Sequence, residues 1–145
     1  MRIGVLNGPN LNLLGQREPE LYGHTSLAEI EKMVRDAATP LGADIDWFQT
    51  NHEGELVEAV QRLQGRAEGA LINAAALTHS SLALRDALLA VQVPFVELHL
   101  SNIFAREPER RHSVIADLAL GMVTGFGAQS YLLALQALMG RLRAT

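Results

Sequence analysis

The sequence contains no cysteine. Disulfide bonds, thiolate metal sites and thiol nucleophiles are therefore excluded from any account of its function. Lysine is almost absent as well, because Lys32 is the only lysine among 12 basic residues. Lys32 lies off the apolar stripe of its predicted helix, and a reactive lysine usually needs burial or a cationic neighbour to lower its pKa. A covalent lysine mechanism is therefore disfavoured.

Long apolar runs and an extreme charge are also missing. No run approaches about 18 apolar residues, so we expect no transmembrane helix. Met1 and Arg2 lead straight into a predicted strand without a signal-peptide pattern, which predicts a cytoplasmic protein. The net charge of −4 argues weakly against a nucleic-acid partner. The 145 residues show no repeat and no linker, so we expect one domain over residues 1–145.

Two common ligand motifs are absent. His24, His52 and His112 do not have the spacing of zinc ligands. The segment Asn7–Asn10 lacks the glycine and lysine order of a phosphate-binding loop. It follows a short apolar run and contains Gly8, which permits unusual dihedral angles, and Pro9, which cannot continue a strand. We therefore predict that a strand ends here and a long polar loop begins.

What the sequence does have is a regular alternation of strand and helix patterns. The predicted strands are Ile3–Leu6, Asp44–Phe48, Ala70–Ile72, Phe95–Leu98 and Met122–Thr124, and the predicted helices are Leu27–Leu41, Glu55–Gln64, Ser80–Val91 and Gln129–Arg143. Capping boxes are expected at Ser26/Glu29 and Thr50/Glu53. The alternation predicts a doubly wound α/β fold, with a five-stranded parallel sheet covered by helices on both faces. The order of the strands cannot be read from the sequence.

Polar side chains follow the ends of three predicted strands. They are Asn10, Arg17 and Tyr22 after the first strand, Asn73, Thr78, His79 and Ser80 after the third, and Glu97, His99, Ser101, Asn102, Arg106 and Arg110 at or after the fourth. The carboxyl ends of parallel strands meet at one edge of the sheet, where ligands bind. We therefore expect these side chains to converge on one crevice.

Each of these residues also has a purely structural interpretation. Tyr22 is consistent with loop packing, Arg17 with an exposed surface arginine and His79 with a helix cap. Glu97 and His99 are harder to explain in that way, because residues two apart on a buried strand point to the same side and need polar partners.

Three charged groups leave further alternatives open. Arg106 and Arg110, four residues apart, fit either a basic surface or a clamp on a carboxylate. Asp86 fits either an ion pair with Arg85 or a functional role.

Taken together, these groups suit one kind of chemistry. A tyrosine beside an arginine can act as a base, and a histidine beside a carboxylate can act as an acid. The pattern favours proton abstraction next to a carbonyl group, followed by acid-assisted loss of a leaving group. The arginines indicate a small polar acid as substrate.

Five segments, in this order, make the chain resemble type II 3-dehydroquinate dehydratase. They are Asn7–Gly23, Gln49–Gln61, Ile72–Leu88, Val96–Ser113 and Gly125–Leu135, so the resemblance covers nearly the whole chain. It implies a flavodoxin-like fold, one catalytic domain, no metal or cofactor, and a lid that carries Arg17 and Tyr22. It also implies a homododecamer built from four trimers and a place in the shikimate pathway.

The resemblance further implies a role for each residue of the site. Tyr22, activated by Arg17, removes a proton next to the ketone of 3-dehydroquinate. Asn10 holds a water that steadies the enolate, and His99, oriented by Glu97, protonates the departing hydroxyl. The positions that match substrate-binding residues of the family are Asn73, His79, Asp86, Leu100, Ser101 and Arg110, with Arg106 in the same motif. The product is 3-dehydroshikimate.

Two positions depart from the family pattern. Ala75 stands where glycine is usual, which strains the backbone if that residue needs a positive φ. Glu109 stands where phenylalanine is frequent, so its carboxylate either pairs with an arginine or faces solvent or a subunit contact. Two rival interpretations stay open at this point. One is a non-enzymatic binding module of the same fold, and the other is a lyase acting on a related cyclic hydroxy-ketone acid.

Overall fold

Five strands form one parallel sheet in the computed structural model, which describes residues 1–16 and 18–144. The strands are β1 (Arg2–Asn7), β2 (Asp44–Gln49), β3 (Gly69–Asn73), β4 (Phe95–His99) and β5 (Gly121–Thr124). Their order in the sheet is β2-β1-β3-β4-β5, and every neighbouring pair is parallel. The predicted α/β class and five-stranded parallel sheet are therefore confirmed.

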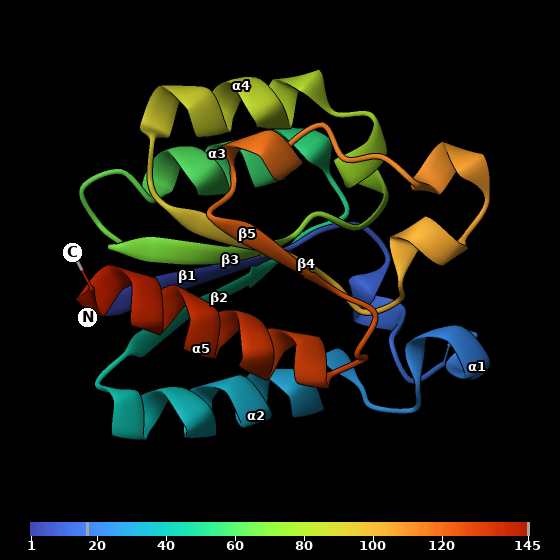
Figure 1. Ribbon diagram of the computed structural model, residues 1–145, viewed down its shortest axis with the longest axis horizontal. Helices are drawn as coiled ribbons and strands as arrows, with labels where there is room; N and C mark the ends of the chain where they lie inside the picture. Colours follow the sequence, from blue (N-terminus) through green and yellow to red (C-terminus); the bar gives the residue numbers. More distant parts are fainter. Residues whose placement is uncertain (17, 145) are drawn as a thin grey trace.

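Helices cover both faces of this sheet (Figure 1). Helices α2 (Leu27–Ala38) and α5 (Gln129–Arg143) lie on one face, and α3 (Glu53–Arg62) and α4 (Leu82–Val91) lie on the other. Successive strand side chains point to opposite faces, so a strand covered on both faces contributes to two cores. Val5 and Leu71 pack beneath α2 and α5, whereas Leu6 and Ile72 pack beneath α3 and α4.

Local signals explain where α2 begins. Ser26 accepts a hydrogen bond from the Glu29 amide, and the Glu29 carboxylate accepts one from the Ser26 amide. The predicted capping box is therefore confirmed. Lys32 lies on the outer surface of α2 with its side chain 78% exposed, as its place off the apolar stripe predicted.

The second predicted capping box, at Thr50 and Glu53, is wrong. Helix α3 begins at Glu53, its N-cap is His52, and no side chain caps it. The Thr50 hydroxyl instead accepts a hydrogen bond from the His52 amide and donates one to the Glu55 carboxylate. Glu53 reaches across to the Ser81 hydroxyl at the start of α4, 2.6 Å away. Glu53 therefore bonds to a residue at the start of α4 rather than to Thr50, and the predicted capping box does not form.

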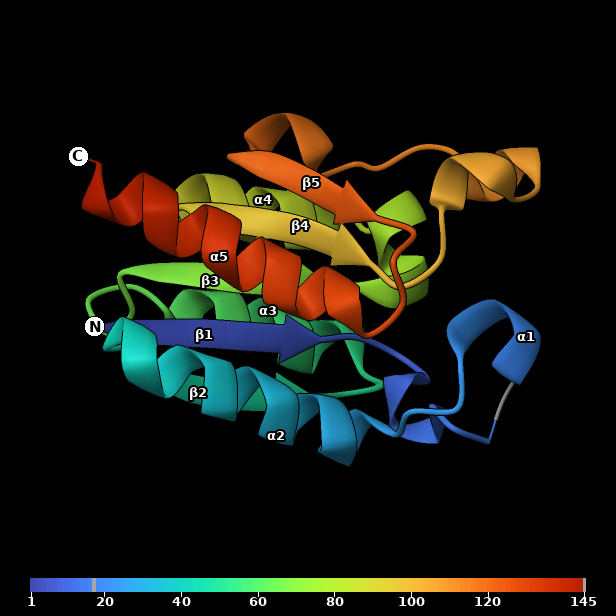
Figure 2. The same ribbon diagram turned by 60° about the horizontal axis from the view of Figure 1, so that its bottom comes forward.

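The loops after the strands meet at one end of the molecule. Figure 2 shows β1, β4 and β5 all pointing towards the end where α1 (Pro19–Tyr22) and the short turns after β4 lie. Those turns are 3-10 helices at Ile103–Ala105 and Pro108–Arg110. Along residues 1–16 and 18–144, none of the helices combines the length and the apolar character that crossing a membrane requires.

Gly8 at the end of β1 is needed for space rather than for an unusual φ. Its φ is not among the positive values, contrary to the role that the sequence suggested. A Cβ at this position would collide with the Ala74 carbonyl oxygen. The Gly8 amide donates to the Asn73 carbonyl at 2.8 Å, so the loops after β1 and β3 run in close contact.

Candidate active site

Most of the predicted site residues line one pocket of about 100 Å³ at the carboxyl ends of β1, β3 and β4. Those that line it are Asn10, Tyr22, Asn73, His79, His99, Leu100, Ser101, Arg106 and Arg110. Segments far apart in the sequence therefore converge, as the topology of a parallel sheet requires. Arg17 lies outside the described residues.

The most deeply buried pair of an imidazole and a carboxylate in this region is His99 with Glu97. His99 Nε2 lies 2.5 Å from Glu97 Oε2, and both side chains are buried. The Ser113 hydroxyl donates to the other carboxylate oxygen at 2.9 Å. Glu97 thereby fixes the orientation of the imidazole and provides a counter-ion when the ring is protonated, which leaves the second ring nitrogen for proton transfer.

Tyr22 meets an arginine that the sequence analysis placed elsewhere. Arg106 Nη1 donates to the Tyr22 hydroxyl at 2.9 Å, and the guanidinium carbon lies 5.6 Å from the centre of the tyrosine ring. A guanidinium at this distance stabilises a phenolate by Coulomb attraction and by hydrogen bonding. Within the described part of the chain, Arg106 is therefore placed to stabilise the phenolate of Tyr22, the role that was predicted for Arg17.

The two pocket arginines share one carboxylate. Arg110 Nε lies 2.6 Å from Glu107 Oε1, and Arg106 Nε lies 3.9 Å from the same oxygen. Glu109, the departure from the family pattern, is exposed in the single chain, as expected if it faces solvent or a subunit contact. Two guanidinium groups thus share the single Glu107 carboxylate, and the excess of positive charge at the pocket favours an anionic ligand.

His79 is held by a reciprocal pair of contacts with His112. His79 Nδ1 donates to the His112 carbonyl at 2.6 Å, and His112 Nε2 donates to the His79 carbonyl at 2.9 Å. Burial lowers the pKa of His79, although the hydrogen bond to His112 acts in the opposite direction. The His79 ring stacks near His99, with 6.5 Å between centroids. His79 therefore contributes a neutral ring to the pocket rather than a helix cap.

Asn10 owes its position to two residues without an assigned role in the sequence analysis. Its backbone is left-handed, with φ 69°, and its amide donates to Asn51 Oδ1 at 2.9 Å. Gln49 Nε2 donates both to the same Asn51 oxygen at 3.2 Å and to the Gly8 carbonyl at 3.1 Å. Gln49 and Asn51 belong to the segment Gln49–Gln61, and its resemblance to the family is the one feature of the sequence that points to them. Hydrogen bonds from the end of β2 and the loop after it thus hold the loop after β1 in place.

Asn73 has partners on both sides of its carboxamide. Asn73 Nδ2 donates to the Tyr131 hydroxyl at 3.0 Å, and Asn73 Oδ1 accepts from the Ala75 amide at 3.3 Å. Ala75 has φ 53°, so the strained conformation that a departure from glycine implies is present. The sequence analysis placed Tyr131 in the predicted helix Gln129–Arg143 and in the family segment Gly125–Leu135, but gave it no role in the site.

Asp86 is not among the residues of this pocket. It is exposed on α4, and Arg85 pairs with Asp117 rather than with its neighbour Asp86. Arg85 Nη1 lies 2.6 Å from Asp117 Oδ1, and this contact lowers the pKa of Asp117. The predicted binding role of Asp86 therefore has no support within one chain, and its interaction with Arg85 is limited to Coulomb attraction, because the direct ion pair of Arg85 is with Asp117.

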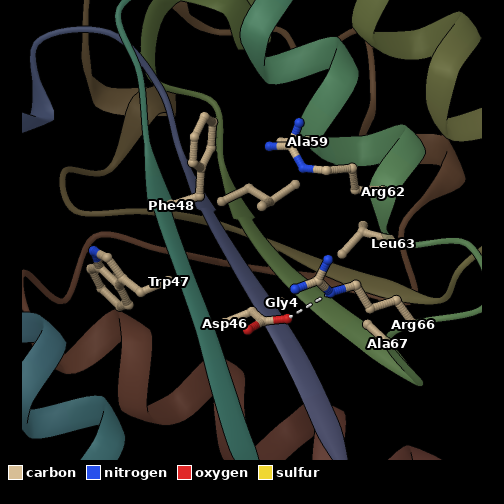
Figure 3. Close-up of a pocket in the computed structure, with 10 residues that line it drawn as sticks. Gly4, Asp46, Trp47, Phe48, Ala59, Arg62, Leu63, Arg66 and Ala67 are labelled. Carbon is tan, nitrogen blue, oxygen red and sulfur yellow. Dashed lines mark ion pairs between the residues drawn. The ribbon is translucent and has the colours of Figure 1, made fainter.

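A second hollow, of about 180 Å³, lies between β2 and α3 (Figure 3). Asp46 and Phe48 on β2 face Arg66 and Arg62, with Asp46 Oδ2 3.5 Å from Arg66 Nε and the Arg62 guanidinium 5.3 Å from the Phe48 ring. Arg2 also contacts Asp46, so its carboxylate is already neutralised. This hollow has no paired base and acid, and we place the chemistry at the carboxyl ends of the strands instead.

Lys32 is poorly suited to covalent catalysis. Its amine lies 2.7 Å from Asp36 Oδ2, and this contact raises the pKa of Lys32. A raised pKa keeps the amine protonated, whereas a nucleophilic lysine must be neutral.

A family model described as dehydroquinase class II matches residues 1–139. The chain belongs to the class II dehydroquinase family. Dehydroquinases are dehydratases, so the chain belongs to a family of hydro-lyases, and the resemblance drawn from the sequence is confirmed.

Individual members of the dehydroquinase family match nearly the full length of the chain. It is 59% identical over 143 residues to a 3-dehydroquinate dehydratase from Parasynechococcus marenigrum, covering 99% of this chain and 98% of that protein. It is 51% identical over 132 residues to a catabolic 3-dehydroquinase from Penicillium rubens, covering 91% of this chain and 85% of that protein. The crystal structure of type II dehydroquinase from Propionibacterium acnes matches with a TM-score of 0.91 at 38% identity, covering 96% of each chain.

Proposed function

We propose that this chain removes water from 3-dehydroquinate to give 3-dehydroshikimate, and that the whole chain acts as one catalytic domain. The observation that carries the proposal is a pocket lined by a tyrosine that is hydrogen-bonded to an arginine and by a histidine that pairs with a buried carboxylate behind it. These are a base with a counter-charge and an acid with an orienting group, as an elimination beside a ketone requires.

In the first step, Tyr22 acts as the base. Its phenolate removes a proton from the carbon next to the ketone, and the electrons of the broken C–H bond form an enolate. Arg106 stands 2.9 Å from the Tyr22 oxygen and offsets the negative charge of the phenolate. Arg17, which the resemblance implicates, adds a second positive charge in this proposal.

In the second step, the enolate collapses and the C–O bond to the departing hydroxyl breaks. His99 gives a proton to that hydroxyl, which leaves as water, and Glu97 balances the charge of the imidazolium before transfer. Asn10, in its fixed left-handed conformation, holds a water that hydrogen-bonds to the enolate oxygen. Solvent exchange then returns Tyr22 and His99 to their starting protonation states.

The remaining pocket residues bind the substrate. Arg110 supplies positive charge for an anionic group, and the Leu100–Ser101 segment supplies polar groups next to His99. Asn73 and His79 offer amide and imidazole groups for hydrogen bonds to hydroxyls. We expect no metal or cofactor to be needed for these steps.

Asp86 enters this scheme only through a second copy of the chain. It is exposed on α4, outside the pocket of its own chain, so a neighbouring subunit must present it if it binds substrate. This is consistent with the expected homododecamer of four trimers. Light scattering on the purified protein measures the mass directly, and a monomer would contradict the assembly.

The test of the activity is an ultraviolet assay for the conjugated enone. Purified protein is incubated with 3-dehydroquinate and a metal chelator, beside the Tyr22→Phe variant. We expect the wild type to form the enone and the variant to be at least about 100-fold slower, because it lacks the base.

Two other results would contradict parts of the proposal. Near wild-type turnover by Tyr22→Phe would remove Tyr22 as the base. A folded wild-type protein that forms no enone would instead favour a binding module. The same dehydration serves both biosynthesis and quinate breakdown, and one relative is named as a catabolic 3-dehydroquinase. Of these two settings we propose the biosynthetic one, the shikimate pathway, and a cytoplasmic location.

A further inference from the structure

A buried tyrosine joins the ends of the neighbouring strands β1 and β3. Asn7 and Asn73 are register partners at the carboxyl ends of β1 and β3. The Tyr131 hydroxyl, on α5, lies between them, 2.6 Å from Asn7 Oδ1 and 3.0 Å from Asn73 Nδ2. All three side chains are buried, and Tyr131 and Asn7 have no exposed surface. Asn73 alone among them lines the pocket.

Backbone groups fix the direction of every hydrogen bond in this chain of side chains. Asn7 Nδ2 donates to the Phe48 carbonyl at 3.0 Å, so Asn7 Oδ1 is left to accept from Tyr131. The single hydroxyl proton of Tyr131 is thereby used, and its oxygen must accept from Asn73. At the other end the Ala75 amide can only donate, which fixes Asn73 Oδ1 as an acceptor.

We infer that Tyr131 is a positioning residue, which sets the carboxamide of Asn73 so that its second N–H faces the bound substrate. The inference deepens the function proposed above and rests on it. Asn73 has two amide protons, and Tyr131 takes one of them, so the other is available to a substrate hydroxyl or oxyanion. Without the Tyr131 hydroxyl, the hydrogen bond of 3.3 Å from the Ala75 amide is the remaining contact described above that orients the carboxamide, and the carboxamide can turn over by breaking it and present its oxygen instead.

A purely structural role for Tyr131 leads to a different expectation. Its ring packs against Trp47, with 5.8 Å between centroids, and this packing does not depend on the hydroxyl. Burial raises the pKa of Tyr131, so the group stays a neutral hydrogen-bonding phenol throughout the working pH range. Tyr131→Phe keeps the ring and deletes only the hydroxyl.

The experiment compares KM and kcat for wild type, Tyr131→Phe and a control, Ser130→Ala. Ser130 is the adjacent residue on α5, is equally buried, and accepts from the Phe126 amide at 3.0 Å without touching Asn73. We expect Tyr131→Phe to raise KM about five- to tenfold, the effect of one hydrogen bond, with a smaller change in kcat. Ser130→Ala should leave KM unchanged. A KM within twofold of wild type in folded Tyr131→Phe would overturn the inference.

A double-mutant cycle tests whether the effect passes through Asn73. In an Asn73→Ala background, Tyr131→Phe should change KM less than twofold, because there is no carboxamide left to orient. An effect of full size in that background would also overturn the inference. If Tyr131→Phe does not fold, Asn7→Leu is used, since it frees the tyrosine proton to point at Asn73 and should raise KM in the same way.

Failure of the proposed function is recognised separately. If folded wild type forms no enone, that proposal fails, and crystal structures of wild type and Tyr131→Phe then decide the positioning role. A carboxamide of Asn73 that turns over in the variant supports the inference. A carboxamide that keeps the same hydrogen bond to Ala75 in both structures contradicts it.

Discussion

At the scale of single residues, Ala75 is the clearest point of strain. Its φ of 53° lies in the left-handed region, which costs a residue with a Cβ about 1–2 kcal/mol. Its amide nevertheless donates to Asn73 Oδ1, so the conformation serves the pocket. The strain therefore sits next to a candidate binding residue, where such conformations are common.

Replacing Ala75 by glycine should stabilise the fold. Relief of strain is partly offset by the greater freedom of glycine in the unfolded chain and by the loss of a methyl group, so we expect a gain of up to about 1 kcal/mol, or about 2–4 °C in Tm. Ala76→Gly is the matched control, because Ala76 has no positive φ and glycine there should destabilise by about 0.5–1 kcal/mol. Thermal unfolding of both variants measures this, and a lower Tm for Ala75→Gly would contradict it.

The residues that sequence reasoning found are those whose chemistry is visible in their type. Glu97 and His99 were predicted to face the same side because of their spacing on a strand, and they are in contact. Tyr131, Asn51 and Ser113 were missed as site residues because each acts through another residue, Asn51 through a backbone amide and the other two through a side chain. Such contacts depend on three-dimensional neighbours, and no local spacing in the sequence encodes them.

At the scale of elements, the regular helices and strands were predictable, and the turns between them were not. Helix α5 spans the predicted range Gln129–Arg143, because its apolar residues recur with helical periodicity. The 3-10 turn Ala75–His79 was not predicted. It is shaped by contacts with other loops, as when the Val114 amide donates to the Thr78 carbonyl.

The loop after β2 should matter for activity although none of its residues was assigned to chemistry. Asn51 holds the amide of Asn10 at 2.9 Å, so Asn51→Ala releases the loop that carries Asn10. We expect kcat to fall about tenfold with little loss of Tm, which corresponds to about one misplaced hydrogen bond. Asn12→Ala, an exposed change on the same loop as Asn10, should leave kcat unchanged. Equal effects of the two variants in a steady-state assay would speak against this role for Asn51.

At the scale of the whole molecule, the convergence of distant segments follows from the strand pattern, whereas the expected homododecamer rests on the family resemblance alone and stays a prediction. The parallel sheet brings the loops after β1, β3 and β4 together, so one pocket could be expected from the strand pattern alone. Asp86 does not join that pocket within one chain, because α4 carries it on an exposed surface. The sequence identifies such a residue only by its motif and does not reveal which subunit uses it.

Subunit mixing should reveal how Asp86 is used. If a neighbouring copy supplies it, then Asp86→Ala and Tyr22→Phe are each inactive alone, and mixed oligomers recover activity. Each working site needs Tyr22 from one chain and Asp86 from the other, so refolding a 1:1 mixture should restore about a quarter of the wild-type rate. The enone assay on the mixture measures this. Full activity of Asp86→Ala alone, or no recovery on mixing, would refute the shared site.

The scarcity of lysine has a practical consequence for handling the protein. Lys32 is the chain's one side-chain amine, it stands on the outer surface of α2, and it is not among the residues that line the pocket. An amine-reactive dye or surface will therefore attach at this point and at the terminal amine, leaving the pocket residues unmodified. Because Asp36 raises the pKa of Lys32, coupling will need alkaline buffer. The fold thus provides a defined attachment point for fluorescence or immobilisation.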